Sequence, residues 1–215
     1  MSTFKKLNMK TVKISIIGFL ALLAFSRCSP ENDIENPTIE EFLFYEEFLS
    51  VTEQTEDQPL QIESWTNFAE VGTVKWTQGF YSGTKYGQCT AYQSDEASNI
   101  SWLVSPAINM DANSNEKLVF DVAQAYVSSS SNSLELFYSV NYDGTNVLAA
   151  NWKALSFTKP PLEFDTNFDF FSSGFIDLSQ YSGNIYLAFK YKGSGTNTSL
   201  DGTYSIDNIR IFNQN

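Results

Sequence analysis

The chain has 215 residues, of which 42% are hydrophobic and 15% aromatic, so it holds enough apolar material for one buried core. Its 25 acidic and 13 basic residues give a formal net charge of −12, which disfavours nucleic acid as a partner because polyphosphates bind to clustered Lys and Arg. The sequence contains no histidine, which excludes Ser/His/Asp and Cys/His catalysis and the usual zinc sites.

Residues 1–27 are predicted to form a secretory signal peptide. Four lysines in the first 13 positions precede a largely apolar stretch at residues 14–26. A membrane-spanning helix needs about 20 apolar residues, whereas a short apolar run behind a basic segment is typical of a cleaved export signal. Removal of this segment would leave 8 basic and 25 acidic residues, a net charge of −17.

Cys28 follows the apolar run directly, in the segment LAFSRC at residues 23–28. This segment resembles the lipobox of bacterial lipoproteins, whose cysteine is acylated, although Arg27 stands where a small residue is usual. A plain secretory peptide with an incidental cysteine is the alternative. Two or three acyl chains would hold the protein at a membrane, because each buried methylene contributes about 0.8 kcal/mol. We therefore expect an exported protein, anchored through this lipid at the outer membrane or cell surface.

Residues 28–40 are polar and acidic and contain Pro30 and Pro37, which predicts a flexible tether. If Cys28 carries lipid, Cys89 has no disulfide partner within the chain. We interpret Cys89 as a small buried apolar residue, since no histidine is present to activate its thiol.

Residues 41–215 are predicted to form a single all-β domain. Short β-prone runs alternate with Gly, Asn, Asp and Ser clusters, and no long stretch has a 3.6-residue period. The clearest strand is residues 185–192, where Ile185, Leu187 and Phe189 share one face. Further strands are expected at residues 42–48, 71–80, 100–108, 117–126, 134–142, 147–157, 168–178 and 203–212. Because a sheet must bury one face, the pattern predicts a two-sheet antiparallel β-sandwich.

Several stretches together resemble one family: SWLVSPAI at 101–108, LELFYSVNYDG at 134–144, SGFIDL at 173–178, AFKY at 188–191 and YSIDNI at 204–209. This combination resembles the choice-of-anchor J domain, which is similar to cleaved adhesin domains of secreted cysteine proteinases and more remotely to MAM domains. The resemblance covers nearly all of residues 41–215 and implies a galactose-binding-like jelly roll of a Gram-negative surface lipoprotein. We expect the strand around Trp102 to stop at Pro106, and Ile206, Ile209 and Ile211 to lie beside the first strand.

The resemblance also implies a candidate calcium site. Jelly-roll domains of this broad type hold a structural Ca²⁺ between the first and last strands, with a carboxylate from each, and Ca²⁺ takes oxygen ligands. The matching residues are Glu47 and Asp207. The alternative is that Asp207 stabilises a bulge or turn while Glu47 is solvated.

Exposed aromatic rings are the second kind of candidate site, because sugars stack on them while amides and carboxylates bind the hydroxyl groups. Six aromatic residues are available: Trp65, Trp76, Tyr81, Tyr86, Tyr92 and Trp152. Trp76 and Trp152 lie among polar residues and are the preferred platform candidates. The alternative is that they belong to the core, as Trp102 does by its apolar neighbours.

These features predict a non-catalytic surface module that captures extracellular glycan or protein by binding or adhesion. A structural scaffold subunit without a small ligand is the first alternative, and it should expose one unusually large apolar patch. A glycoside hydrolase built on two carboxylates is the second alternative, and no motif marks such a pair. A glycan binder should instead show an open row of aromatic rings near amides on one sheet or loop rim.

Overall fold

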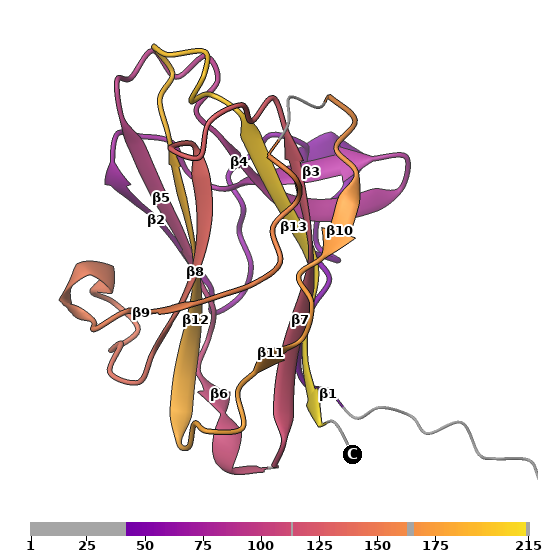
Figure 1. Ribbon diagram of the computed structural model, residues 1–215, viewed down its shortest axis with the longest axis vertical. Helices are drawn as coiled ribbons and strands as arrows, with labels where there is room; N and C mark the ends of the chain where they lie inside the picture. Colours follow the sequence, from indigo (N-terminus) through magenta and orange to yellow (C-terminus); the bar gives the residue numbers. More distant parts are fainter. Residues whose placement is uncertain (1–41, 113, 163–165, 214–215) are drawn as a thin grey trace, which may run out of the picture. The chain divides into compact units, whose positions relative to one another are not determined.

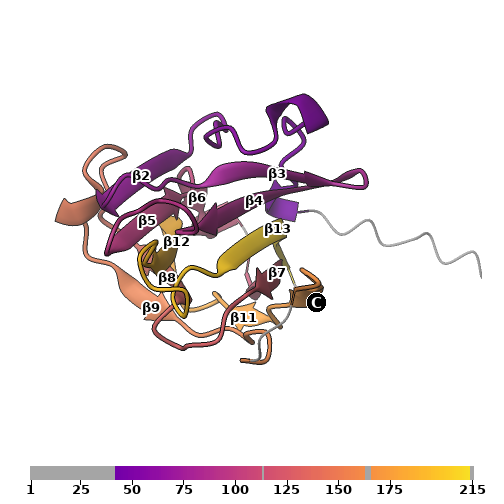
Figure 2. The same cartoon turned by 90° about the horizontal axis from the view of Figure 1, so that it is seen from above.

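Two antiparallel β-sheets packed face to face form the domain, as Figures 1 and 2 show. The computed structural model describes residues 42–112, 114–162 and 166–213, and thirteen β-strands lie within them. The helices in this part of the chain, η1 (Glu53–Thr55), η2 (Met110–Ala112) and η3 (Val147–Ala149), are too short to cross a membrane. The predicted two-sheet antiparallel sandwich is confirmed. The predicted signal peptide, the predicted tether and Cys28 lie outside the described residues.

The first sheet has seven strands in the order β10-β7-β13-β4-β3, with β1 also paired to β13 and β11 to β7. The first described strand therefore lies beside the last one, as the apolar residues near the C-terminus predicted. Its strands are β10 (Phe170–Ser172), β7 (Glu116–Ala125), β13 (Thr203–Asn213), β4 (Thr84–Thr90), β3 (Thr77–Tyr81), β1 (Phe42–Glu46) and β11 (Ile176–Asp177).

The second sheet has six strands in the order β2-β5-β12-β8-β9, with β6 also paired to β12. Strand β5 ends at Val104, before Pro106, as expected from the missing amide hydrogen of proline. Its strands are β2 (Thr66–Val71), β5 (Asn99–Val104), β12 (Asn184–Gly193), β8 (Ser133–Ser139), β9 (Lys153–Leu155) and β6 (Ile108–Asn109).

The core lies between the two sheets. On β12, Ile185, Leu187 and Phe189 are all fully buried, as their alternation predicted. The ring of Phe189 packs edge-on against Phe120 of β7, with ring centroids 5.1 Å apart. Burial of each such side chain contributes about 1.5–3 kcal/mol. Cys89 is also fully buried, and burial raises the pKa of its thiol, so it is a core residue and not a nucleophile.

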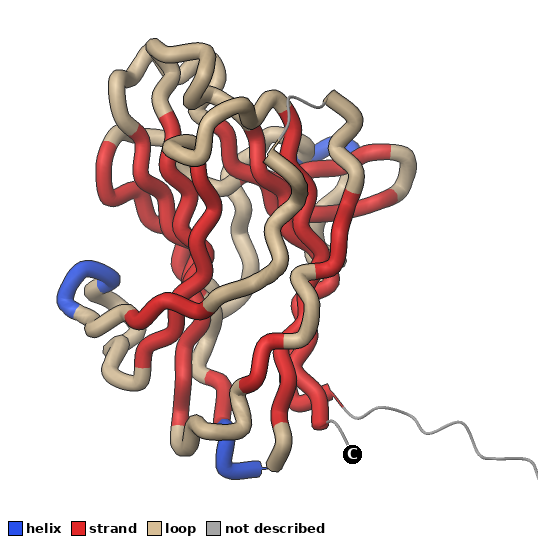
Figure 3. The backbone as a smooth tube through the Cα atoms, viewed as in Figure 1, coloured by secondary structure: helices blue, strands red, loops and turns tan. Residues whose placement is uncertain are grey.

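The structure corrects the strand prediction in two places. Strands β2 and β4 were not predicted, because neither has a clear apolar alternation and β4 contains Gly87. A Cβ at Gly87 would approach the ring of Phe48 to 3.0 Å, so this strand uses glycine to let the core close over it. The long strands expected at 147–157 and 168–178 contain only the short β9, β10 and β11, and most of this region is loop (Figure 3).

Candidate functional site

The outer face of the seven-stranded sheet carries the candidate site. Residues paired directly across antiparallel strands lie on the same face. The pairings place five residues in one row across the sheet: Phe170, Ala123, Ser205, Gln88 and Thr77. Their chain neighbours Cys89 and Ile206 belong to the core between the sheets, so the row faces away from the core.

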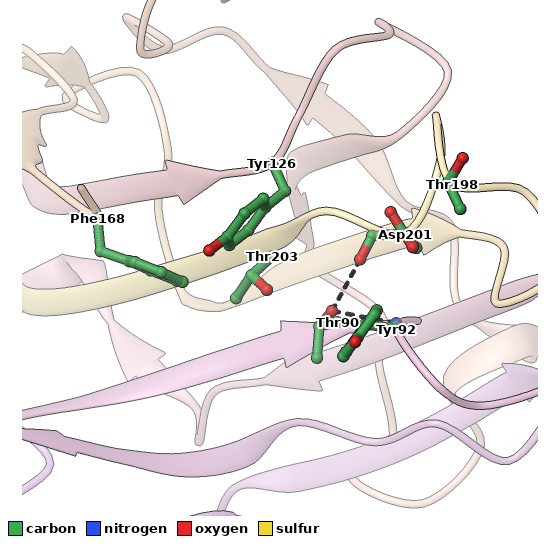
Figure 4. A pocket seen from close by; sticks show the side chains of 7 residues that line it. All are labelled: Thr90, Tyr92, Tyr126, Phe168, Thr198, Asp201 and Thr203. Carbon is green, nitrogen blue, oxygen red and sulfur yellow. Dashed lines mark hydrogen bonds between the residues drawn. The ribbon is translucent and has the colours of Figure 1, made fainter. Parts of the chain in front are cut away.

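Two cavities lie along this face. One has a volume of about 490 Å³ and is lined by Thr90 and Thr203, the rings of Tyr92, Tyr126 and Phe168, and further polar residues. Figure 4 shows these side chains gathered over β4 and β13. The other has a volume of about 680 Å³, and its lining includes Tyr81, Tyr86, Gln88, Phe168, Phe170 and Ser205. Because Phe168 lines both, we name the two cavities together the aromatic trough.

Aromatic rings form the walls of the trough. Tyr86 packs edge-on against Phe170 with centroids 5.6 Å apart, and Tyr126 packs in the same way against Phe168 at 6.1 Å. The ring of Tyr86 lies so close to the backbone of Gly79 that a Cβ there would overlap it. Glycine is therefore required opposite Tyr86 for this wall to form.

Small side chains form the floor between these walls. Ala123 pairs with Ser205, and Ala125 pairs with Thr203. The side chains in the middle of the outer face are therefore short. Ser205 is only 1% exposed, and its Oγ has no hydrogen-bond partner. A hydroxyl group can donate one hydrogen bond and accept two, so this floor residue keeps its bonding capacity for a ligand group that reaches it.

The polar lining of the trough is acidic. Glu56, Asp57 and Asp169 line the larger cavity and Asp201 the smaller one, and neither lining includes a lysine or an arginine among its described residues. The Asp57 Oδ1 accepts a hydrogen bond of 2.9 Å from Gln88 Nε2. Burial, with the charges of Glu56 and Asp57, raises the pKa of the Tyr86 phenol. The trough thus combines ring faces with acceptors and an amide.

One buried phenol ties together the loops that frame the smaller cavity. The Tyr191 Oη accepts hydrogen bonds from the Ala91 amide at 2.9 Å and from Asn132 Nδ2 at 3.2 Å, and it donates to the Gly202 carbonyl at 2.9 Å. Ala91 precedes Tyr92, and Gly202 lies between Asp201 and Thr203, so these bonds position lining residues. Burial raises the pKa of Tyr191, which keeps its hydroxyl protonated and able to donate.

The structure contradicts the expectation that Trp76 is an exposed platform. Its side chain is 0% exposed and packs in the core, with its ring centroid 6.5 Å from that of Phe189. Asn67 holds its backbone from both sides, accepting from the Trp76 amide at 3.1 Å and donating to its carbonyl at 2.8 Å. The polar neighbours of Trp76 in the sequence therefore do not indicate exposure.

Trp152 lies in a different place, on the outer face of the six-stranded sheet. It is half-buried between Trp102 and Tyr142, with ring centroids 5.5 and 5.7 Å away, and its indole donates to the Val147 carbonyl at 2.8 Å. The structure therefore does not bring Trp152 and Trp76 together. Of the six aromatic residues considered from the sequence, Tyr81, Tyr86 and Tyr92 line the trough. The sequence analysis missed Phe168, Phe170 and Ser205, which also line it.

Asp207 lies at a bulge in β13, where the pairing with β7 shifts register before Arg210. Asn208 at the bulge has a positive φ of 49°; its amide donates to Asp207 Oδ1 and its side chain to Asp121 Oδ2, each at 2.7 Å. Burial, together with the charges of Asp121, Glu47 and Glu46, raises the pKa of Asp207 to about 6. This geometry matches the alternative in which Asp207 stabilises a bulge.

The same region holds the predicted calcium ligands. Glu47 is exposed just after β1, and Asp207 is 8% exposed. The described residues contain no group of three or more acidic or cysteine side chains placed to hold a metal ion. A cation bound beside Asp207 would offset the charges of Asp121, Glu47 and Glu46, which contribute after burial to its raised pKa. A calcium ion at Glu47 and Asp207 stays a prediction.

Comparisons with known proteins give a family and several structural likenesses. The model described as Domain of unknown function (DUF5017) matches residues 80–215, which is more than half of the chain. No curated protein matches the sequence.

Three similar solved structures share 12–17% of their residues with this chain. The K1 cleaved adhesin domain of Lys-gingipain from Porphyromonas gingivalis is 12% identical, with a TM-score of 0.48 over 80% of this chain and 98% of that chain. The K3 domain of the same protein is 15% identical, with a TM-score of 0.49 over 80% and 99%. A CBM22 xylan-binding domain from Paenibacillus barcinonensis is 17% identical, with a TM-score of 0.41 over 80% and 94%.

Proposed function

The chain belongs to the DUF5017 family, whose description leaves the function open, and we propose that this member is a non-catalytic glycan-binding module of the bacterial cell surface. The aromatic trough is the observation that carries this proposal. Ligand sites combine apolar and aromatic walls with a few convergent polar groups. The trough offers the rings of Tyr81, Tyr86 and Tyr92 for stacking, with Gln88 and Asp57 beside them to bind hydroxyl groups.

The chemistry of the lining favours a small polar ligand over a protein partner. A scaffold subunit without a small ligand should present a large apolar surface, because stable protein interfaces are apolar at their centre. The trough has largely apolar walls but also carries the carboxylates of Glu56, Asp57, Asp169 and Asp201, and charged residues are depleted at the centre of protein interfaces. Capture of a protein through another face remains the alternative within the same binding role.

A binding role without catalysis is proposed because glycoside hydrolysis needs a pair of carboxyl groups that flank the bound sugar, and no motif in the sequence marks such a pair.

The proposed location is the outer membrane or cell surface, with the domain held by lipid on Cys28. Support comes from the basic and apolar residues 1–27, the lipobox-like segment that ends at Cys28, and the acidic tether after it. The strongly acidic mature chain suits an exported, well-solvated protein.

A glycan array with the full chain purified in detergent tests the proposal, run with calcium and again with chelator. We expect a selective hit that weakens when Tyr81 or Tyr92 becomes Ala, since these rings are 76% and 62% exposed and their loss should not disturb the core. An aromatic contact contributes about 0.5–1.5 kcal/mol, which corresponds to a roughly 2- to 13-fold loss of affinity. Tyr45→Ala is the matched control, because Tyr45 is 59% exposed and lies outside the trough. A blank array in both conditions, or equal losses in all three variants, would refute the proposal.

A further inference from the structure

We propose that the aromatic trough selects glycans without acidic groups and rejects those that carry carboxylate, sulfate or phosphate. This inference rests on the proposed function, because it names the ligand class of the same trough. It covers uncharged glycans and glycans with amino groups, which the test below separates.

The distribution of charge along the trough is the first argument. Carboxylates line both cavities: Glu56, Asp57 and Asp169 in the larger, and Asp201 in the smaller. The described lining residues include no lysine or arginine to offset them. An acidic sugar would therefore meet like charges without the cation that normally binds such a group, and like charges facing each other across an interface oppose binding.

The surroundings of the trough strengthen this repulsion. The chain carries a net charge of −12, so no distant excess of positive charge compensates the local carboxylates. Burial raises the pKa of the Tyr86 phenol, and the charges of Glu56 and Asp57 contribute to this shift. An anionic ligand group beside that ring would be disfavoured by the same field.

The neutral groups of the trough are those that a hydroxyl-rich ligand can use. Ser205 lies on the floor, is 1% exposed, and has no partner for its Oγ. A sugar hydroxyl can both donate to and accept from such an oxygen, whereas a carboxylate can only accept. The small side chains beside it, Ala123 and Ala125, leave the space between the ring walls for a narrow substituent.

The test uses the full chain in detergent on an array of uncharged, amino-bearing and acidic glycans, in about 0.15 M salt, where charges are screened beyond roughly 8 Å. Tyr92→Ala in the smaller cavity and Tyr81→Ala in the larger one serve to assign each hit to the trough. We expect every hit that either variant weakens to lack acidic groups. An acidic glycan that binds selectively and is lost in either variant would overturn the inference while leaving the proposed function standing. An array without selective hits would instead overturn the proposed function and, with it, the ligand class.

A charge-neutralising variant then tests the cause of the selectivity. The bound glycan is compared with its carboxymethylated form and its hydroxyethylated form, which are of similar size and differ in charge. We expect at least tenfold weaker binding of the carboxymethylated form only, and at least threefold recovery in the double variant Asp57→Asn with Asp201→Asn. Glu63→Gln is the matched control, since Glu63 is exposed and lies outside the trough. Equal binding of both derivatives, or no recovery in the double variant, would overturn the inference.

Discussion

Replacement of Tyr191 by Phe should destabilise the domain by about 2–6 kcal/mol, because it leaves two buried backbone groups without partners, at roughly 1–3 kcal/mol each. The change removes one oxygen and keeps the ring, so packing is retained. The Ala91 amide and the Gly202 carbonyl lose their partner, whereas Asn132 Nδ2 keeps a hydrogen bond of 2.8 Å to the Lys192 carbonyl. For a domain of this size the melting temperature should fall by about 2–4 °C for each kcal/mol.

Urea unfolding followed by tryptophan fluorescence measures this cost, from the midpoint and the slope of the transition. Tyr204→Phe is the matched control, because Tyr204 is a second buried tyrosine of the same region that makes one hydrogen bond, to the Asn132 carbonyl at 3.1 Å. It should cost about half as much, roughly 1–3 kcal/mol, because it leaves only the Asn132 carbonyl without this partner. Equal costs for the two variants would refute the assignment of Tyr191 as the residue that ties the loops together.

Three further predictions concern charge, metal and location. The pKa of Asp207 is raised to about 6 in the folded chain from an ordinary value near 3.8. Between these two pH values the carboxyl group of Asp207 is therefore protonated in the folded state and ionised in the unfolded state. Stability should therefore fall as the pH rises from about 4 to about 6, and Asp207→Asn should remove this step in urea midpoints measured against pH. If Ca²⁺ binds between Glu47 and Asp207, chelator should lower the melting temperature at pH 7 and not in Asp207→Asn; an unchanged melt would exclude the ion. Cys28→Ala should move the protein from the membrane fraction to the soluble fraction, and continued membrane association would contradict the lipid anchor.

The predictable part of the fold is the part where side chains alternate. The strand at residues 185–192 and the one at 203–212 were both predicted, because buried apolar residues recur at every second position in β12 and on either side of the bulge in β13. Strand β4 was missed because Cys89 is the one apolar side chain on its inner face. Gly87, on the same face, has no side chain, and the ring of Phe48 packs against its backbone instead. Hydrophobic periodicity identifies a strand by the difference in polarity between its two faces. In β4 this difference is small.

The candidate site was less predictable because it depends on register. Gln88 and Ser205 are 117 positions apart in the chain, and only the pairing of β4 with β13 places them together on one face. Sequence reasoning can assign each residue to the inner or the outer face of its own strand. It cannot say which outer residues of other strands lie beside it.

A local signal for the trough was nevertheless present. Trp76 lies in the core, whereas Thr77 directly after it begins β3 on the outer face, so the polar neighbours Lys75 and Thr77 gave no information about Trp76. Val74, two positions before Trp76, is an apolar residue packed against the core. For Tyr86 both residues two positions away, Thr84 and Gln88, are polar and line the larger cavity with it. The polar residues on both sides of Tyr86 therefore agree with its place on the outer face, and Val74 agrees with the burial of Trp76.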